Sequence, residues 1–287
     1  ALLYVILAAS MWGTIGISIR IISQFHFSPI QMVVARLLTA DVFIGGFLLV
    51  TDRNKFKIKL KDIKWFLGIG ILSVLFFNTC YCITVQMTSL SIAAVLLYTS
   101  PVFVMLLSIP IFKEKITKYK LMAIILSVIG CALVSGIFSS DIAQISQKGL
   151  IFGICAAVGY AFYSIFARIL LTKYHSFTII FYTFLIAGVG GTFLGNVPGI
   201  VNICVETPIA IVAIIGSALT CSVLPYILYT KALVHMEASR ASVIASVEPV
   251  VATVIGIFVF AEKITIAAVL GIICVLAAIG ILNAKQN

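Results

Sequence analysis

Long stretches of this chain carry no charged residue, and this feature limits the folds that it can adopt. Asp, Glu, Lys and Arg are all absent between Trp65 and Phe112, between Leu121 and Ser140, and between Ser176 and Val205. About 20 apolar residues of helix cross the hydrocarbon core of a bilayer, so each stretch predicts one or two transmembrane helices. A soluble domain carries about 25% charged residues, whereas this chain carries 10%. The sequence therefore predicts an all-α polytopic membrane protein.

Polar breaks divide the apolar residues into ten predicted transmembrane helices. The short polar turn Gln86–Ser89 divides the longest charge-free stretch. The first apolar run continues to Ile22, longer than the apolar part of a secretory signal, so we expect a first span whose leading residues precede residue 1. The ten predicted spans are 2–22, 30–50, 65–86, 91–112, 119–138, 149–168, 177–195, 208–230, 239–260 and 264–283.

Lysine and arginine are distributed unevenly over the predicted loops. With the N-terminus inside, fifteen of the 19 fall in cytoplasmic segments and three in external ones. Because cytoplasmic loops carry an excess of these residues, we expect a cytoplasmic membrane protein with both termini in the cytoplasm. The same placement accounts for the net charge of +10 without a nucleic-acid partner. The Lys-rich segment 53–64 is expected to lie against the lipid headgroups of the bilayer.

The chain matches itself at an offset of 148 residues without a gap. Scattered matches between apolar segments are common by chance, but a polar tetrapeptide repeated at the same offset as a proline, an arginine and a tyrosine is not. The matched positions are Glu114–Thr117 with Glu262–Thr265, Pro101 with Pro249, Arg20 with Arg168, and Tyr81 with Tyr229.

This offset predicts two inverted repeats. Each half holds five spans, an odd number, so the second half enters the membrane from the opposite side. The expected organisation is a first repeat over 1–138, an external linker over 139–148 and a second repeat over 149–287. Two equivalent halves can exchange conformations, which would open a central site to one side and then to the other.

Several segments together resemble a known family. In the first half they are Ala35–Ala40, which contains Arg36, then Ser91–Val102, Glu114–Thr117 and Gly130. In the second half they are Ser239–Ala241, Val247–Val250, Phe260–Thr265 and the small-residue helix that ends at Gly280. The set resembles the EamA branch of the drug/metabolite transporter superfamily over nearly the whole chain. The resemblance implies ten helices, a central cavity, and alternating access for small metabolites, often amino acids that leave the cell.

The two halves differ at one position of this pattern. The first half has Ser100 before Pro101, whereas the second has Glu248 before Pro249. A proline frees a backbone carbonyl and weakens the helix, and an ionised side chain at mid-span costs about 2.5–3.5 kcal/mol. We expect Glu248 to bind substrate, accept a coupled proton or act as a gate, and both prolines to serve gating. The alternative is a structural carboxylate that is paired with a cation such as Arg36 or hydrogen-bonded to nearby backbone.

Arg36 and Asp41 also lie within a predicted span. They are five residues apart, so they occupy different helix faces and seek different partners. Arg36 can bind a substrate carboxylate or extend to the outer surface. Asp41, near the midplane, is a candidate for gating or coupling.

Aromatic side chains at mid-span are further candidates for substrate contact, because belt aromatics belong at the membrane surfaces. Trp12 and Tyr160 are equivalent across the repeat, and Tyr163 shares a helix face with Tyr160. The alternative for each ring is ordinary helix packing. The remaining candidates are Asn78, Tyr81 and Tyr98, whereas Tyr229 is expected in the aromatic belt.

Other chemistry has little support in the sequence. No metal-ligand spacing, HExxH, GxSxG or phosphate-binding loop is present, so we expect no metal, no cofactor and no ATP drive. The segment Lys231–Arg240 is expected to be a solvated loop, and a gating ion pair among its charged residues is the alternative. The leading hypothesis is a secondary transporter that exports amino acids or related metabolites; the alternatives are a non-transporting receptor or scaffold, an exporter of drugs or nucleoside-type compounds, and an intramembrane enzyme.

Overall fold

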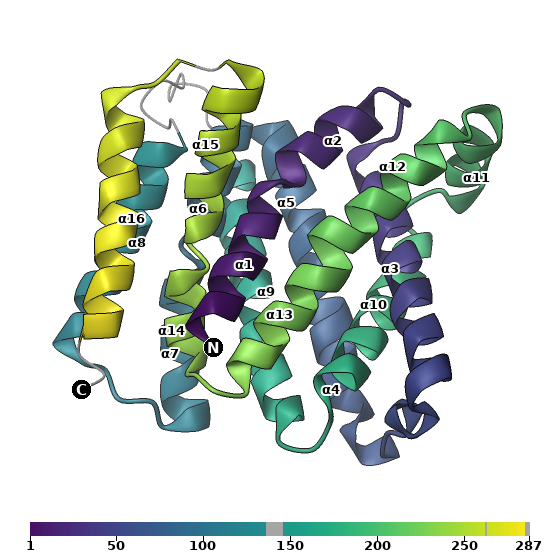
Figure 1. Ribbon diagram of the computed structural model, residues 1–287, viewed down its shortest axis with the longest axis horizontal. Helices are drawn as coiled ribbons and strands as arrows, with labels where there is room; N and C mark the ends of the chain where they lie inside the picture. Colours follow the sequence, from purple (N-terminus) through teal and green to yellow (C-terminus); the bar gives the residue numbers. More distant parts are fainter. Residues whose placement is uncertain (136–145, 262, 285–287) are drawn as a thin grey trace.

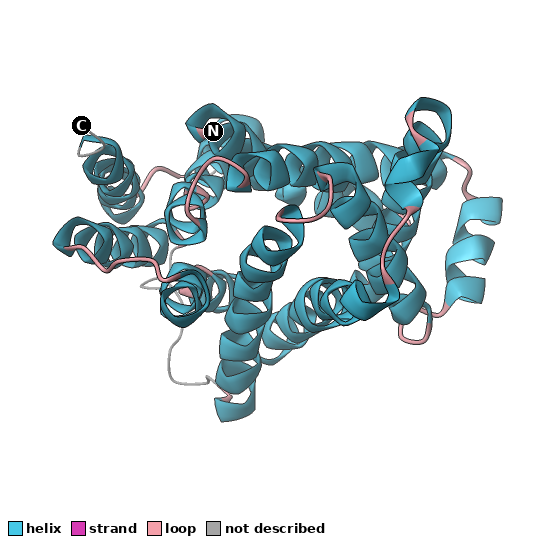
Figure 2. Ribbon diagram, turned by 90° about the horizontal axis from the view of Figure 1, so that it is seen from below, coloured by secondary structure: helices cyan, strands magenta, loops and turns pink. Residues whose placement is uncertain are grey.

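The computed structural model describes residues 1–135, 146–261 and 263–284, and these residues form helices and loops without a strand (Figures 1 and 2). The α-helices are α1 (Leu2–Gly13), α2 (Ile15–Ser23), α3 (Pro29–Thr51), α4 (Ile63–Leu67), α5 (Phe76–Met87), α6 (Leu90–Leu97), α7 (Ser100–Phe112), α8 (Lys118–Val134), α9 (Gln147–Leu171), α10 (Ser176–Thr192), α11 (Val197–Glu206), α12 (Ile209–Ala218), α13 (Leu224–Leu233), α14 (Ala238–Ile244), α15 (Val247–Phe260) and α16 (Ile266–Ala284). Two 3-10 segments, η1 (Arg53–Phe56) and η2 (Leu60–Asp62), and two π-helical segments, η3 (Gly68–Leu75) and η6 (Leu219–Val223), complete them.

Each of the ten predicted spans is mainly helical in its described residues; residues 136–138 of the fifth span lie outside them. Seven continuous stretches are long and apolar enough to cross a membrane: Leu2–Ser23, Pro29–Thr51, Leu60–Met87, Leu90–Phe112, Gln147–Leu171, Ile209–Ala232 and Ala238–Phe260. The remaining three are α8 and α10, with 17 residues each, and α16, with 19. Because transmembrane helices range from about 17 to 25 residues, these three are short but sufficient. The all-α polytopic fold is confirmed.

Side chains at the helix ends explain where several helices begin. A Ser, Thr or Asn oxygen just before a helix accepts one of its free N–H groups, which would otherwise lack a partner. Ser28 and Gln31 form a reciprocal capping box at the start of α3. The other N-terminal caps of this kind are Ser89, Thr117, Ser146, Asn196 and Thr265.

The loop after α10 differs from the prediction. The sequence predicts a plain loop after residue 195, but α11 lies there, at 95° to α10. It stands at the edge of the bundle at the upper right of Figure 1. Pro198 near its start and the capping Asn196 begin this short helix, and such local signals are hard to separate from turn signals.

Irregular backbone recurs at the predicted offset of 148 residues. The π-helical segments η3 and η6 end at Leu75 and Val223, which are equivalent positions. Lys113 and Ala261, also equivalent, both adopt left-handed conformations, with φ of 55° and 53°. Left-handed residues other than glycine are uncommon, so their recurrence supports the internal repeat independently of the sequence matches.

The fourth and ninth spans are both broken near their middles. In the first, α6 ends at Leu97 and α7 begins at Ser100; in the second, α14 ends at Ile244 and α15 begins at Val247. The breaks precede Pro101 and Pro249, whose rings cannot continue a helix without loss of a hydrogen bond. Broken spans at corresponding positions of two repeats are typical of transporters.

Helix packing also follows the repeat. α3 packs against its equivalent α10, and α8 against its equivalent α16. The pair α1 with α13 matches the pair α9 with α5, and α1 with α15 matches α9 with α7. The largest buried cluster includes Leu37, Phe66, Val104, Ile180 and Phe184, which come from both halves. The two repeats therefore form one bundle with a shared core.

Two glycines bring α8 and α16 into backbone contact at one side of the bundle (left in Figure 1). A Cβ atom on Gly271 would lie 2.6 Å from the carbonyl oxygen of Gly130, and one on Gly130 would lie 2.8 Å from that of Gly271. Because real Cβ contacts are longer, this close approach requires glycine on both helices.

The two ends of the bundle differ in charge. We call the end with loops 52–62, 113–117, 172–175 and 234–237 the basic end, and the other the opposite end. α1 begins and α16 ends on the basic side (lower in Figure 1). The predicted linker 139–148 lies mostly outside the described residues, as do Glu262 and Lys285; α9 already begins at Gln147.

Candidate substrate site and gate

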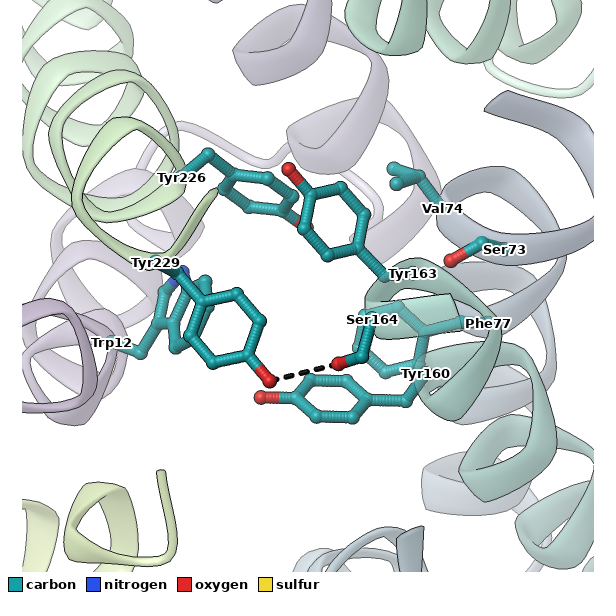
Figure 3. A pocket seen from close by; sticks show the side chains of 9 residues that line it. All are labelled: Trp12, Ser73, Val74, Phe77, Tyr160, Tyr163, Ser164, Tyr226 and Tyr229. Carbon is teal, nitrogen blue, oxygen red and sulfur yellow. Dashed lines mark hydrogen bonds between the residues drawn. The ribbon is translucent and has the colours of Figure 1, made fainter. Parts of the chain in front are cut away.

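Aromatic rings from three helices meet in the middle of the bundle (Figure 3). Trp12 of α1 contacts Tyr226 and Tyr229 of α13, with ring centroids 5.5 and 5.4 Å apart, and Tyr160 of α9 at 6.4 Å. Tyr163 packs edge-on against Tyr226 at 4.9 Å. Such tilted and edge-on pairs are favoured by the ring quadrupoles. The equivalent residues Trp12 and Tyr160 are thus in direct contact.

Hydrogen bonds hold two of these rings in place. The hydroxyl of Tyr163 bonds Thr230 at 2.6 Å, and that of Tyr229 bonds Ser164 at 2.8 Å. Tyr229 is 2% exposed, so its predicted place in the aromatic belt is wrong. Tyr229 is equivalent to Tyr81 in the repeat, and Tyr81 is itself a mid-span candidate for substrate contact. This equivalence is the sequence signal for an interior position of Tyr229.

The space between these rings is small in this conformation. It has a volume of about 10 Å³, room for about one water molecule. Its lining also includes residues that the sequence did not suggest, namely Ser73, Val74, Phe77, Ser164 and Tyr226. A ligand can therefore enter only if the rings or the helices that carry them move.

Glu248 faces a second group of aromatic side chains beside the first. It lies close to Tyr98, Tyr81 and Tyr160. Glu248 and these three tyrosines are only partly buried, although they face one another from different helices. Their exposed surface therefore faces interior space, because lipid cannot reach groups that several helices surround.

Arg36 and Asp41 have no ion pair or side-chain hydrogen bond among the described residues. The Arg36 Nε and one Asp41 carboxylate oxygen are buried without a hydrogen-bond partner. The predicted alternative, a structural pair of Arg36 with Glu248, is not formed here. Asn78 donates to the Val74 carbonyl of its own helix at 2.7 Å.

Glu114 is the centre of a polar cluster at the basic end, which we call the clasp. Its buried carboxylate accepts hydrogen bonds from the Arg168 guanidinium, the Ser239 hydroxyl and, at 3.2 Å, the Ala238 backbone N–H. Lys120 lies 3.8 Å from it. Glu114 belongs to the first repeat and three of these partners to the second, so the clasp joins the repeats.

The loop before α14 also takes part in the clasp. Glu237 binds Lys120 across the repeats at 2.5 Å. Its side chain is 41% exposed, so the loop is solvated at this residue and also carries an ion pair. A charged residue in a short loop gives no local sign of its partner when that partner lies more than one hundred residues away.

The opposite end differs in the contacts that its described residues make; Glu262, the equivalent of Glu114, lies outside the described residues. Ser91 is equivalent to Ser239, yet its side chain makes no hydrogen bond among the residues that the structure describes. α14 packs against α7 and α9, whereas its equivalent α6 has no comparable packing against α15 or α1. Arg20 and Arg168 nevertheless stack on equivalent rings, Phe260 at 3.6 Å and Phe112 at 4.5 Å. Among the described residues, α14 thus closes across the repeats at the basic end, and α6 makes no such contact at the opposite end.

The rest of the basic end is held by polar contacts between loops. Lys173 and the Tyr174 hydroxyl both donate to the Asp62 carboxylate, at 2.7 and 2.8 Å. Burial, and the neighbouring Lys55 and Lys231, lower the pKa of His175 below its usual value. Its Nδ1 accepts the Phe177 N–H and begins α10. The Lys-rich segment therefore packs against the second repeat.

These features define a class of protein. A helical membrane bundle built from two repeats, with broken spans that meet beside mid-span polar groups, is the architecture of a membrane transporter. Among the described residues, no group of three or more His, Cys, Asp and Glu is arranged to hold a metal.

Comparison with known proteins identifies the family. The EamA-like transporter family matches residues 1–136 and 147–284, so the chain belongs to this family and is a transporter of the drug/metabolite type. It is 24% identical to an uncharacterized transporter of Archaeoglobus fulgidus, over 96% of this chain and 93% of that protein.

Other relatives also match over nearly the whole chain. An uncharacterized transporter of Bacillus subtilis, YxxF, is 25% identical over 100% of this chain and 90% of its own length. The uncharacterized inner membrane transporter YicL of Salmonella typhimurium is 24% identical over 97% and 93%. A solved crystal structure matches with a TM-score of 0.79 at 12% identity, over 98% of this chain and 96% of its own, which supports the fold alone.

Proposed function

We propose that this transporter is a secondary carrier that exports small organic metabolites, such as amino acids or related compounds, by alternating access. The observation that carries the proposal is the unequal closure of two equivalent ends. At the basic end α14 packs against α7 and α9, whereas at the opposite end its equivalent α6 has no comparable packing against α15 or α1. Two repeats that can exchange these arrangements would open a central site to each side in turn.

The charges indicate which end of the bundle faces the cytoplasm. Lys and Arg gather in the loops of the basic end, which the positive-inside rule places in the cytoplasm. The proposal therefore puts both termini inside and the protein in the cytoplasmic membrane. The closed end is then the cytoplasmic one, and this conformation is ready to release its solute outside or to bind one from there.

Mid-span residues support a polar organic solute. Arg36 is a partly buried cation whose Nε has no hydrogen-bond partner among the described residues, and a charge withdrawn from water without a partner is costly. A carboxylate on the solute would supply its partner. Glu248, which faces interior space among tyrosines, would bind an ammonium group or a coupled proton. The rings of Trp12 and Tyr160 would cover the apolar part of the solute.

A transport assay tests the function itself. Purified protein in liposomes is given labelled amino acids, nucleosides and organic acids, with and without a pH gradient. We expect movement of at least one amino acid. Movement of nucleosides or hydrophobic drugs alone would favour the alternative substrate class. If nothing moves under any gradient, a receptor or scaffold becomes the better interpretation.

Matched variants test the site. Glu248→Gln is expected to abolish the response to a pH gradient while the protein remains folded. An unchanged pH response would remove Glu248 from coupling. Trp12→Ala and Tyr160→Ala are expected to change substrate range or apparent affinity more than yield. Wild-type profiles in both variants would show that these rings only pack.

A further inference from the structure

A second cavity lies outside the proposed substrate site, as a cleft at the basic end. It has a volume of about 670 Å³, within the range of about 300–1,000 Å³ for small-ligand sites. The beginning of α8, the end of α9, the loop before α14 and the end of α16 form its walls. The charged or titratable residues that line it are Lys115, Lys120, Arg168, His235, Glu237 and Arg240.

The cleft has an excess of positive charge. Lys115, Lys120, Arg168 and Arg240 supply four cations, whereas Glu237 is the one acid among the described lining residues. Glu114 lies behind the cleft and engages Arg168 and Lys120. Two acids against four cations leave a net positive charge even if both acids are ionised, and like charges held together favour an anion between them.

The arrangement of the donors favours a phosphate group. Lysine and arginine reach the cleft from both repeats, and Thr117 and Tyr119 bring hydroxyls to the same cleft. A phosphate presents several oxygens in different directions and can accept from all of these donors, whereas a carboxylate has two oxygens. We propose that this cleft binds a phosphate-bearing anion that joins the two repeats at the basic end.

The cleft is coupled to the clasp because they share residues. Lys120 and Arg168 contact Glu114 and also line the cleft. Two of the four cations belong to each repeat, so they converge only while the basic end is closed. A ligand that binds one conformation stabilises that conformation, and the bound anion therefore favours the closed basic end. This inference does not depend on transport.

The source of the phosphate is either a free phosphate in solution or the headgroup of an anionic lipid. Ile281 and Leu282 of α16 form an apolar edge of the cleft. The neighbouring residues Leu121 and Met122 of α8 are 45% and 50% exposed, so lipid chains can reach this side. Both sources offer the same phosphate oxygens to the cations.

The test compares two double variants that lose the same charge. Lys115→Gln with Arg240→Gln removes two cations from the cleft. Lys113→Gln with Lys118→Gln removes two from the same end that do not line it. Each protein is placed in discs of neutral phosphatidylcholine and titrated with inorganic phosphate, and the thermal midpoint is recorded. A parallel series replaces part of the lipid with phosphatidylglycerol.

The outcomes separate the sources and decide the proposal. We expect the cleft variant to respond to the anion about tenfold more weakly than the control variant. If the two variants differ in their response to inorganic phosphate, the ligand is a free phosphate. If they differ only in the phosphatidylglycerol series, the ligand is a lipid headgroup. Equal responses of the two variants in both series overturn the site. Lys115→Gln alone replaces the double variant if Arg240→Gln prevents folding.

Discussion

The two broken spans contain equivalent helices, α14 at the basic end and α6 at the opposite end, and these two helices make different contacts. At the basic end, Ser239 and the first backbone N–H of α14 bind Glu114, which also holds Arg168. At the opposite end, the equivalent Ser91 has no side-chain hydrogen bond in the described part of the chain. The comparison teaches that equivalent sequences at the two ends make different contacts, so the packing of the helices decides which contacts form.

The largest effect is expected from removal of the clasp carboxylate. Glu114→Gln leaves Arg168 without its ion pair, and loss of one partner of a buried pair costs about 3–5 kcal/mol. We expect lower stability in denaturant titration and faster hydrogen exchange in residues 236–246, with the opposite end unaffected. Glu206→Gln, at an exposed acid of the opposite end, is the control. Unchanged exchange in α14 would show that Glu114 does not close this end.

A matched pair of serine variants compares the two ends directly. Ser239→Ala removes a hydrogen bond to a charged group and is expected to cost about 2 kcal/mol of unfolding free energy. Ser91→Ala, at the equivalent position, is expected to cost almost nothing in this conformation. Denaturant titration of both variants measures the difference. Equal losses would mean that both ends are held to the same degree.

A glycine variant tests the part of the bundle that both conformations are expected to share. Gly271→Ala places a Cβ 2.6 Å from the Gly130 carbonyl, and overpacking costs about 1–3 kcal/mol. Gly280→Ala, on the same helix with open space beside it, is expected to be neutral or slightly stabilising. Thermal midpoints measure both. Hydrogen exchange should change equally at the two ends; a change at one end alone would contradict a shared interface.

The smallest effect is a pH dependence at the basic end. The pKa of His175 is lowered in the folded protein, so the unfolded chain binds a proton first as pH falls. Stability therefore declines below about pH 6.5, the ordinary pKa of histidine, until the folded pKa is reached. His175→Asn, which keeps a capping side chain, is expected to reduce this decline. Thermal midpoints between pH 8 and 5 compare the proteins, and parallel curves would refute this role.

The fold was largely predictable because its signals are local. Charge-free apolar runs, polar breaks and the 148-residue offset predicted ten helices and two repeats, and the structure places helices at all ten positions. The first predicted span, for example, needed only the apolar run to Ile22. In contrast, α11 was missed, since ten residues with a proline and an asparagine resemble a turn.

The candidate site was predictable only in part. Depth in a span indicated Trp12, Tyr160 and Glu248, and the structure places these residues in or beside one aromatic cluster. Tyr229 was misplaced because position along a helix does not reveal which neighbour covers it. Tyr226 gave no signal at all, since its importance comes from its contacts with α1 and α9.

Hydropathy and repetition in the chain were therefore enough for the membrane fold, the helix count and the equivalence of the halves, because these depend on the solvent and on local pattern. Tertiary structure was needed for the clasp, the aromatic cluster and the basic cleft. Their residues are far apart in sequence, and contact between them depends on how helices pack. The same packing also decides which of two equivalent ends is closed, which no property of one segment can encode.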